Sequence, residues 1–243
     1  MPEHEGRNVV ITGGANGIGM SLVHAFHAQG AQVFFCDVDV RAGRALEKEL
    51  GERAVFQKVD LTAEKEVVRW IAEIGRRHRV IHALINNAAR DPRIPLKRAS
   101  TKDWDELFAT NLRACFLTCR EAVKWMRAGS SIVNFSSITF HQGPANMSAY
   151  VATKGGVLGF TRSLARELGP RRIRVNTLSP GWVMTERQMK RWLDAEGERE
   201  LERNQCLPDR LQPHDIARMI LFLASDDAAM CTAQEFKVDA GWC

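Results

Sequence analysis

The chain contains a single tyrosine, Tyr150, and Lys154 follows it four residues later. In a helix, side chains at these two positions project from the same face, about one turn apart. A free tyrosine has a pKa of about 10, so near neutral pH it rarely releases its proton. A neighbouring ammonium group favours the phenolate, so a tyrosine and a lysine at this spacing can act together as a general base. A half-buried tyrosine beside an unrelated lysine has the same spacing, so the pair needs support from its surroundings.

A glycine-rich turn lies between the first expected strand and the first expected helix. Glycines in such a turn let backbone N–H groups approach a pyrophosphate at a helix N-terminus. The spacing here, G-x-x-x-G-x-G, differs from the common G-x-G-x-x-G fingerprint, so the turn alone is a weak signal. Its place in the first strand–helix unit indicates a dinucleotide site formed by Gly13, Asn16, Gly17, Ile18 and Gly19.

An acidic residue, Asp37, ends the second expected strand, 18 residues after Gly19. There its carboxylate can accept hydrogen bonds from the adenosine ribose hydroxyls. The same charge would repel a 2′-phosphate, so the sequence predicts NAD as the cofactor and not NADP. Asp39 is close enough to share or take this role, and Arg41 is placed to receive a phosphate instead. Asp37 could also merely begin a turn.

Length and composition fit one α/β domain over residues 1–243, with no segment typical of a linker. Hydrophobic residues make up 45% of the 243 residues and charged residues 26%, as in ordinary globular proteins. No apolar run approaches the roughly 20 residues that cross a bilayer, and no secretory segment follows Met1, so we expect a cytoplasmic protein without a membrane partner. The six cysteines lack a C-x-x-C pair, and no metal site is expected. Basic residues are spread along the chain despite the net charge of +5, so we expect no nucleic-acid partner.

Hydrophobic periodicity predicts strands that alternate with helices. The expected strands are Asn8–Ile11, Gln32–Cys36, Ala54–Lys58, Ile81–Ile85, Ser131–Phe135, Ile173–Leu178 and Glu235–Val238. The expected helices are Ile18–Gln29, Arg41–Leu50, 63–78, 103–127, 148–168 and 213–224. This alternation predicts a Rossmann-type doubly wound parallel sheet of about seven strands with helices on both faces.

Together these residues resemble the short-chain dehydrogenase/reductase family from Val9 to Trp242. Beyond the glycine turn and the Tyr–Lys pair, the matching positions are Asp60-Leu61, Asn86-Asn87-Ala88, Asn111, Ser137 and Pro180-Gly181-Trp182-Val183-Met184-Thr185. The chain departs from the family at Ala89, where glycine is usual, and at Asp239-Ala240-Gly241. Finer features, including His141 and the tail from Ala224 to Trp242, resemble the bacterial NAD-dependent aldose 1-dehydrogenases of that family, those that act on D-xylose among them.

The resemblance implies a role for each matching residue. Tyr150 is expected to be the general base, Lys154 to lower its pKa and hold the nicotinamide ribose, and Ser137 to hydrogen-bond the reacting oxygen. Asn111 is expected to hold a water that relays protons. Without the resemblance, a serine after a strand is as well explained by capping, and a helical asparagine by burial. The implied cofactor contacts add Asp60, Leu61, Asn87, Pro180, Gly181, Val183 and Thr185.

The stretch at about 185–207 is too charged to be core, and it has two interpretations. It is either a solvated surface segment or a lid that closes over the substrate and excludes water. Trp182, at its base, and Trp192, within it, can pack on the C–H face of a sugar, although most tryptophans are plain packing residues. His141, Gln142 and Gln188 can hydrogen-bond sugar hydroxyls. The predicted reaction is oxidation of the anomeric hydroxyl of a D-xylose-like aldose to a lactone.

Two alternative functions remain open at this point. A 3-oxoacyl reductase or another short-chain enzyme for ketones and secondary alcohols shares the motifs, although the former would use NADPH, which Asp37 disfavours. A non-catalytic NAD-binding protein has no need for Tyr150, Lys154, Ser137 and Asn111 together. Finally, the resemblance implies that the helices at 103–127 and 148–168 pack against another copy in a homodimer or homotetramer.

Overall fold

Seven parallel strands form one continuous sheet, with the order β3-β2-β1-β4-β5-β6-β7. The computed structural model describes residues 4–243. Every predicted strand is present, and no boundary differs from its prediction by more than two residues, so the predicted doubly wound sheet is confirmed. The strands are β1 Asn8–Thr12, β2 Gln32–Asp37, β3 Ala54–Lys58, β4 Ala83–Asn86, β5 Ser131–Phe135, β6 Arg174–Pro180 and β7 Glu235–Val238.

Short apolar runs form these strands because the central ones are covered on both faces. All residues of β4 and β5 are buried. In β1, Val9 and Ile11 point into one hydrophobic core, whereas Val10 points into the other. The sheet therefore separates two cores, each closed by its own layer of helices.

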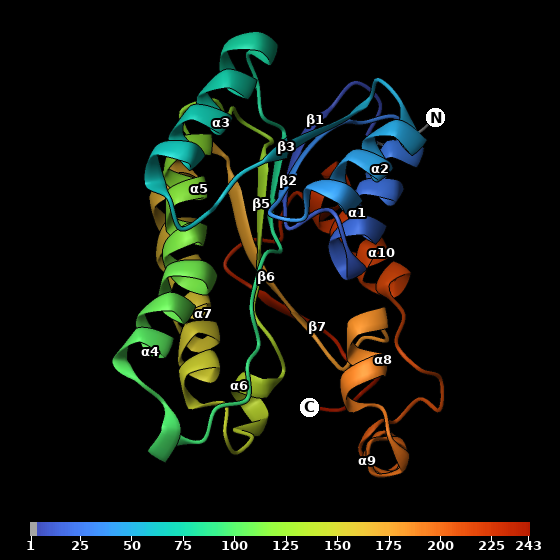
Figure 1. Cartoon of the computed structure of the whole chain (residues 1–243). Helices are drawn as coiled ribbons and strands as arrows, with labels where there is room; N and C mark the ends of the chain where they lie inside the picture. Colours follow the sequence, from blue (N-terminus) through green and yellow to red (C-terminus); the bar gives the residue numbers. More distant parts are fainter. Residues whose placement is uncertain (1–3) are drawn as a thin grey trace.

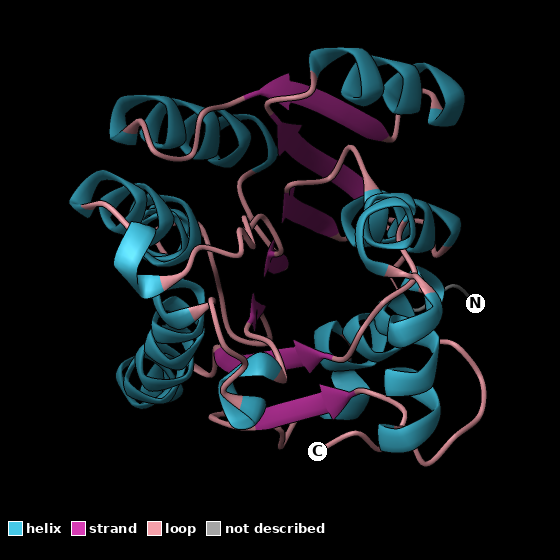
Figure 2. Cartoon of the chain, turned by 60° about the horizontal axis from the view of Figure 1, so that its bottom comes forward, coloured by secondary structure: helices cyan, strands magenta, loops and turns pink. Residues whose placement is uncertain are grey.

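The helices lie in two layers (Figures 1 and 2). In Figure 1, α1, α2 and α10 cover one face of the sheet, and α3, α5 and α7 cover the other. The helices are α1 Gly17–Ala28, α2 Val40–Leu50, α3 Glu64–His78, α4 Thr101–Phe108, α5 Ala114–Ala122, α6 Thr139–Gln142, α7 Ser148–Leu168, α8 Glu186–Trp192, α9 Ala195–Asn204 and α10 Pro213–Ala224. Shorter turns are η1 Leu96–Arg98, η2 Ala109–Arg113, η3 Gly169–Arg171 and η4 Asp226–Ala228.

The prediction of one helix over 103–127 is wrong in two respects. A π-helical turn, η2, separates α4 from α5, and α5 ends at Ala122. Beyond α5 the backbone carbonyls bond to other elements. Val123 and Met126 accept hydrogen bonds from the Arg171 guanidinium at 2.8 and 3.0 Å, and Trp125 accepts one from the Ile81 N–H at 3.0 Å. These long-range bonds replace the helical ones, and sequence periodicity does not report them.

From β1 the chain adds β2 and then β3 on one side, and it then returns to place β4 on the other side of β1. The direction in which strands are added to the sheet therefore reverses between β1 and β4. In open α/β sheets, ligands bind outside the carboxyl ends of the strands at such a switch point. The two helices of the charged stretch, α8 and α9, lie beyond this end of the sheet (Figure 1). Within residues 4–243, no helix is both long and apolar enough to cross a membrane.

Candidate active site

A cavity of about 1280 Å³ opens at the carboxyl ends of the strands. Almost every site residue predicted from the sequence lines it, although these residues come from all parts of the chain. The predicted residues that line it are Gly13, Asn16, Gly17, Ile18, Gly19, Asp37, Asp60, Leu61, Asn87, Ser137, Gln142, Tyr150, Pro180, Gly181, Trp182, Val183, Thr185 and Gln188. Lys154 and Asn111 are buried and do not line it, and neither does His141.

Gly13 and Gly19 of the glycine turn have no room for a side chain. A Cβ on Gly19 would lie 1.8 Å from the carbonyl oxygen of Gly13, and a Cβ on Gly13, where φ is +65°, would lie 2.8 Å from Cα of Ala88. Helix α1 begins at Gly17, and no side chain caps its first turn. The free N–H groups and the positive end of the helix dipole therefore face the cavity, as a pyrophosphate requires.

The carboxylate of Asp37 is held at the end of β2 by two backbone groups. Its Oδ2 accepts a hydrogen bond from the Ala15 N–H at 3.1 Å, and its Oδ1 accepts one from the Asp39 N–H at 3.1 Å. Asp39 instead caps α2 through the Ala42 N–H at 3.0 Å and binds the Asn16 side chain at 3.1 Å. Asp37 lines the cavity and Asp39 does not. The geometry therefore favours Asp37 for contact with a ribose.

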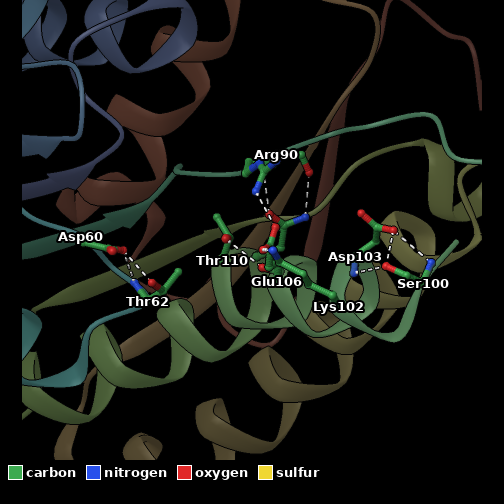
Figure 3. Close-up of polar contacts among 9 residues, drawn as sticks. Asp60, Thr62, Arg90, Ser100, Lys102, Asp103, Glu106 and Thr110 are labelled. Carbon is green, nitrogen blue, oxygen red and sulfur yellow. Dashed lines mark hydrogen bonds and ion pairs between the residues drawn. The ribbon is translucent and has the colours of Figure 1, made fainter.

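The loop after β3 forms the next part of the wall (Figure 3). Asp60 Oδ1 accepts hydrogen bonds from the backbone N–H and the hydroxyl of Thr62 at 2.9 and 2.7 Å. This local turn fixes Leu61, which lines the cavity between the two residues. Asp37, Asp60 and Leu61 thus line the same cavity, as residues that hold the adenosine part of a cofactor would.

The Tyr150 and Lys154 side chains lie on the same face of α7, with Nζ 5.5 Å from the centre of the tyrosine ring. Nζ is buried and donates a hydrogen bond to the carbonyl oxygen of Phe135 at 2.8 Å. Burial lowers the pKa of Lys154 to about 8. Burial also raises the pKa of Tyr150 well above its usual value, whereas a hydrogen bond with Ser137 acts in the opposite direction. In the protein alone, both groups are therefore biased toward their neutral forms.

Ser137 follows β5 and is 7% exposed. Its Oγ accepts hydrogen bonds from the backbone N–H and the hydroxyl of Thr139, at 3.2 and 3.0 Å. Because Oγ acts as an acceptor in both bonds, its own proton remains for the hydrogen bond with Tyr150. A hydroxyl held in this way can donate to a substrate oxygen.

Asn111 lies in the π-helical turn and clamps the backbone of Arg90. Its Oδ1 accepts from the Arg90 N–H and its Nδ2 donates to the Arg90 carbonyl, both at 2.9 Å. Nδ2 also donates to the hydroxyl of Thr153 at 3.2 Å, and Thr153 in turn donates to the Tyr150 carbonyl at 2.7 Å. A small cavity of about 10 Å³ adjoins Asn111 and Phe135, which is close to the least volume that holds one water.

The structure does not bring His141 to the cavity. Its Nε2 lies 2.7 Å from Oε1 of Glu235 on β7, and the Ser179 hydroxyl donates to the same oxygen at 2.6 Å. This contact turns the imidazole toward β7, the edge strand of the sheet. The neighbouring Gln142 does line the cavity and is exposed.

The cavity lining also includes residues that the predictions made on sequence do not name, Trp242 and Asp91 among them. Trp242 faces Trp182, with ring centres 6.5 Å apart. Asp91 reaches across to the charged stretch, where its Oδ2 accepts a hydrogen bond from Nε2 of Gln188 at 2.9 Å. Their only sequence signal is position. Asp91 follows the Asn86-Asn87-Ala88 segment closely, and Trp242 lies in the tail.

Comparison with known proteins agrees with this geometry. A family model described as enoyl-(acyl carrier protein) reductase matches residues 13–243. The D-xylose 1-dehydrogenase of Caulobacter vibrioides is 42% identical, over 99% of this chain and 97% of that protein. This chain belongs to the short-chain dehydrogenase/reductase family. It is therefore an oxidoreductase, a short-chain dehydrogenase acting on CH–OH groups with a nicotinamide nucleotide cofactor.

Two further members of the family are close to this short-chain dehydrogenase. The probable galactose dehydrogenase of Rhizobium meliloti is 40% identical over 99% of this chain and 96% of that protein. A crystal structure titled as a short-chain glucose/ribitol dehydrogenase from Brucella melitensis matches with a TM-score of 0.94 and 31% identity. The match covers 99% of this chain and 98% of that one. Sugar dehydrogenases therefore recur among its relatives. Within residues 4–243, no three His, Cys, Asp or Glu side chains are grouped as a metal site.

Proposed function

We propose that this enzyme uses NAD to oxidise the anomeric hydroxyl of a D-xylose-like aldose to the lactone. The supporting observation is the set of polar side chains that line the cavity together with Tyr150. Ser137, Gln142, Gln188 and Asp91 supply hydroxyl, amide and carboxylate groups, and Trp182 supplies an aromatic face. Such a lining suits a small polyol. The named activities of the D-xylose and galactose dehydrogenases support the same substrate class.

The residues divide the reaction between them. Tyr150 takes the proton of the anomeric hydroxyl, and Ser137 donates a hydrogen bond to that oxygen as it becomes a carbonyl. When bound, NAD⁺ supplies the hydride acceptor and a positive charge near the phenol. Charged Lys154 favours the phenolate, opposing the effect of burial. Asn111 holds a water that carries the proton from Lys154 toward solvent, for which the small cavity beside it has the required size.

The preference for NAD over NADP rests on Asp37. Its carboxylate is fixed by the Ala15 and Asp39 amides and faces the cavity. A 2′-phosphate there would meet a like charge. Arg41, the nearest candidate for binding that phosphate, does not line the cavity.

Three wider features belong to the same proposal. Residues of about 185–207 act as a substrate lid of the single domain. The enzyme works in the cytoplasm, and it assembles as a homotetramer or homodimer through α4, α5 and α7. Trp104 on α4 and Phe116 on α5 are each more than 40% exposed, which suits such a contact. Light scattering after gel filtration measures the assembly directly.

The test is the initial rate of NAD⁺ reduction with D-xylose, L-arabinose, D-glucose, D-galactose and L-rhamnose, with NADP⁺ in parallel. Reduction of NAD⁺ by one or two aldoses, with little reduction of NADP⁺, is the expected result. If none of these sugars reduces NAD⁺, the proposal that the substrate is an aldose is wrong. Acyl thioesters, ketones and secondary alcohols would then be tested, since the matching family model is described as an acyl carrier protein reductase.

A further inference from the structure

The loop after β4 contacts the lid across the cavity at two points. Asp91 forms an ion pair with the Arg187 guanidinium through Oδ1, and its Oδ2 accepts the 2.9 Å hydrogen bond from Gln188. The guanidinium of Arg93 stacks over the ring of Trp192, 3.8 Å from its centre. Arg187 and Trp192 stand at the two ends of α8. The loop therefore contacts both ends of this helix.

The loop itself is firmly held on its other side. Asn111 binds both backbone groups of Arg90, and the Arg90 side chain reaches Glu106 on α4 at 3.4 Å (Figure 3). Past Arg93, the Ile94 N–H donates to the Asn146 carbonyl at 2.7 Å. Asp91 and Arg93 thus project from a segment that is fixed before and after them. Motion at this contact is consequently motion of α8.

The ion pair is better shielded than the others of the lid. The Asp91 and Arg187 side chains are 22% and 47% exposed, whereas the Glu196 and Arg199 side chains, which pair within α9, are 63% and 61% exposed. Open surface pairs contribute little to stability, but charge-assisted hydrogen bonds with reduced solvent contact contribute more. Asp91 also lies near enough to Tyr150 to raise the pKa of the phenol. Asp91, Arg187 and Gln188 line the same cavity as Tyr150, so the contact is part of the active site.

We infer that Asp91 and Arg93 latch helix α8 over the cavity, and that Asp91 is a positioning residue which places Gln188 against the substrate. For the substrate, this inference rests on the function proposed above. The latch must open for an aldose to enter and close again to exclude water. Asp91 acts through Arg187 and Gln188, so its loss weakens substrate binding more than it slows the chemical step.

Amide hydrogen exchange of residues 185–193 in the cofactor-free enzyme tests the latch without any substrate. We expect exchange to be about threefold to tenfold faster in Asp91→Asn and in Arg187→Gln. The double variant is expected to exchange no faster than the faster single variant, because both changes remove one interaction. Arg199→Gln, which removes an ion pair confined to α9, is the matched control and leaves this segment unchanged. The charge-swapped pair Asp91→Arg with Arg187→Asp restores protection.

Kinetics test the positioning role separately. For the best aldose, Asp91→Asn is expected to raise KM about threefold to tenfold and to change kcat less than about twofold. Unchanged exchange in Asp91→Asn, or additive effects in the double variant, would overturn the latch whether or not sugars are substrates. A normal KM, or a fall in kcat alone, would overturn the positioning role. Faster exchange in an enzyme that oxidises no sugar would leave the latch standing and refute the proposed function.

Discussion

The cofactor end of the cavity and its lid are built by different means. Around the glycine turn, side chains are excluded by backbone atoms, and β1 beneath it is enclosed from Val9 to Thr12. The lid has no comparable packing. Of the residues of α8 and α9, only Gly197 and Leu201 are buried, and polar contacts such as Asp91 to Arg187 link α8 to the body.

This difference in packing suits the two regions to two tasks, which are to hold the reacting groups in place and to admit the substrate. Close packing fixes the turn, Asp37 and Tyr150 in one arrangement, because any displacement meets backbone atoms or a buried strand. Ion pairs and a cation–π contact are individually weak and can open at small cost. The rigid end is thus suited to hold a cofactor and a base in register. The lid is suited to open and close over a substrate.

The largest effect is expected at the rigid end. Tyr150→Phe removes the proposed proton acceptor and leaves the shape of the cavity almost unchanged. Turnover should fall by about 10²–10⁴-fold, the usual contribution of a general base. The affinity for NADH, measured by fluorescence titration, should stay within about twofold. Activity retained in this variant would show that another group takes the proton.

Burial of Lys154 should lower the free energy of unfolding by an amount that depends on pH. Its pKa is lowered from 10.5 to about 8 in the folded protein because the side chain is buried. Below pH 8 it is charged in both states, so the fold bears the full burial penalty of about 3 kcal/mol. Between pH 8 and 10.5 the folded state loses the proton first, the unfolded state binds more protons, and stability rises with pH.

Lys154→Met removes this titration. Its free energy of unfolding, relative to that of the native enzyme, should therefore be highest near pH 7 and fall by about 3 kcal/mol on going to pH 10.5. The lost hydrogen bond to Phe135 adds a penalty that is the same at every pH. Urea unfolding at pH 7, 8, 9 and 10 measures the difference. A constant difference would mean that the ammonium is better solvated than its burial indicates.

The sequence predicts the rigid end far better than the lid, for physical reasons. Buried parallel strands require continuous apolar runs such as Val9–Ile11, and a tight phosphate turn requires glycine. Both requirements are local and visible in the residues themselves. The same holds for Tyr150 and Lys154, whose spacing in one helix places them on one face.

Contacts between distant segments leave no such local signal. Asp91 and Arg187 are 96 residues apart, and nothing in either segment indicates the other. His141 bonds to Glu235, and helix α5 ends at Ala122. Both features also depend on residues that lie far away along the chain. Substrate residues predicted one by one are therefore less secure than those defined by a turn or a helix.

The preference for NAD⁺ over NADP⁺ tests Asp37, which lies at the border of the rigid end. Asp37→Ser should lower kcat/KM for NAD⁺ about tenfold to thirtyfold, since the two hydrogen bonds that we propose between Asp37 and the ribose are lost. The ratio of kcat/KM for NAD⁺ to that for NADP⁺ should also fall. Asp39→Asn is the matched control, because asparagine retains the cap of α2. A larger effect from Asp39→Asn than from Asp37→Ser would transfer the ribose contact to Asp39.

The smallest effect is expected where the lid meets the body. Trp182 lies beneath α9, where a Cβ on Gly197 would be 2.8 Å from its ring, and beside Trp242. Trp182→Leu keeps an apolar contact but loses the broad face on which a sugar ring packs. The KM for the aldose should rise about threefold, and the KM for NAD⁺ should not change. An equal rise in both KM values would mean that the packing of Trp182 also sets the cofactor site, and the rigid end and the lid would then not be independent.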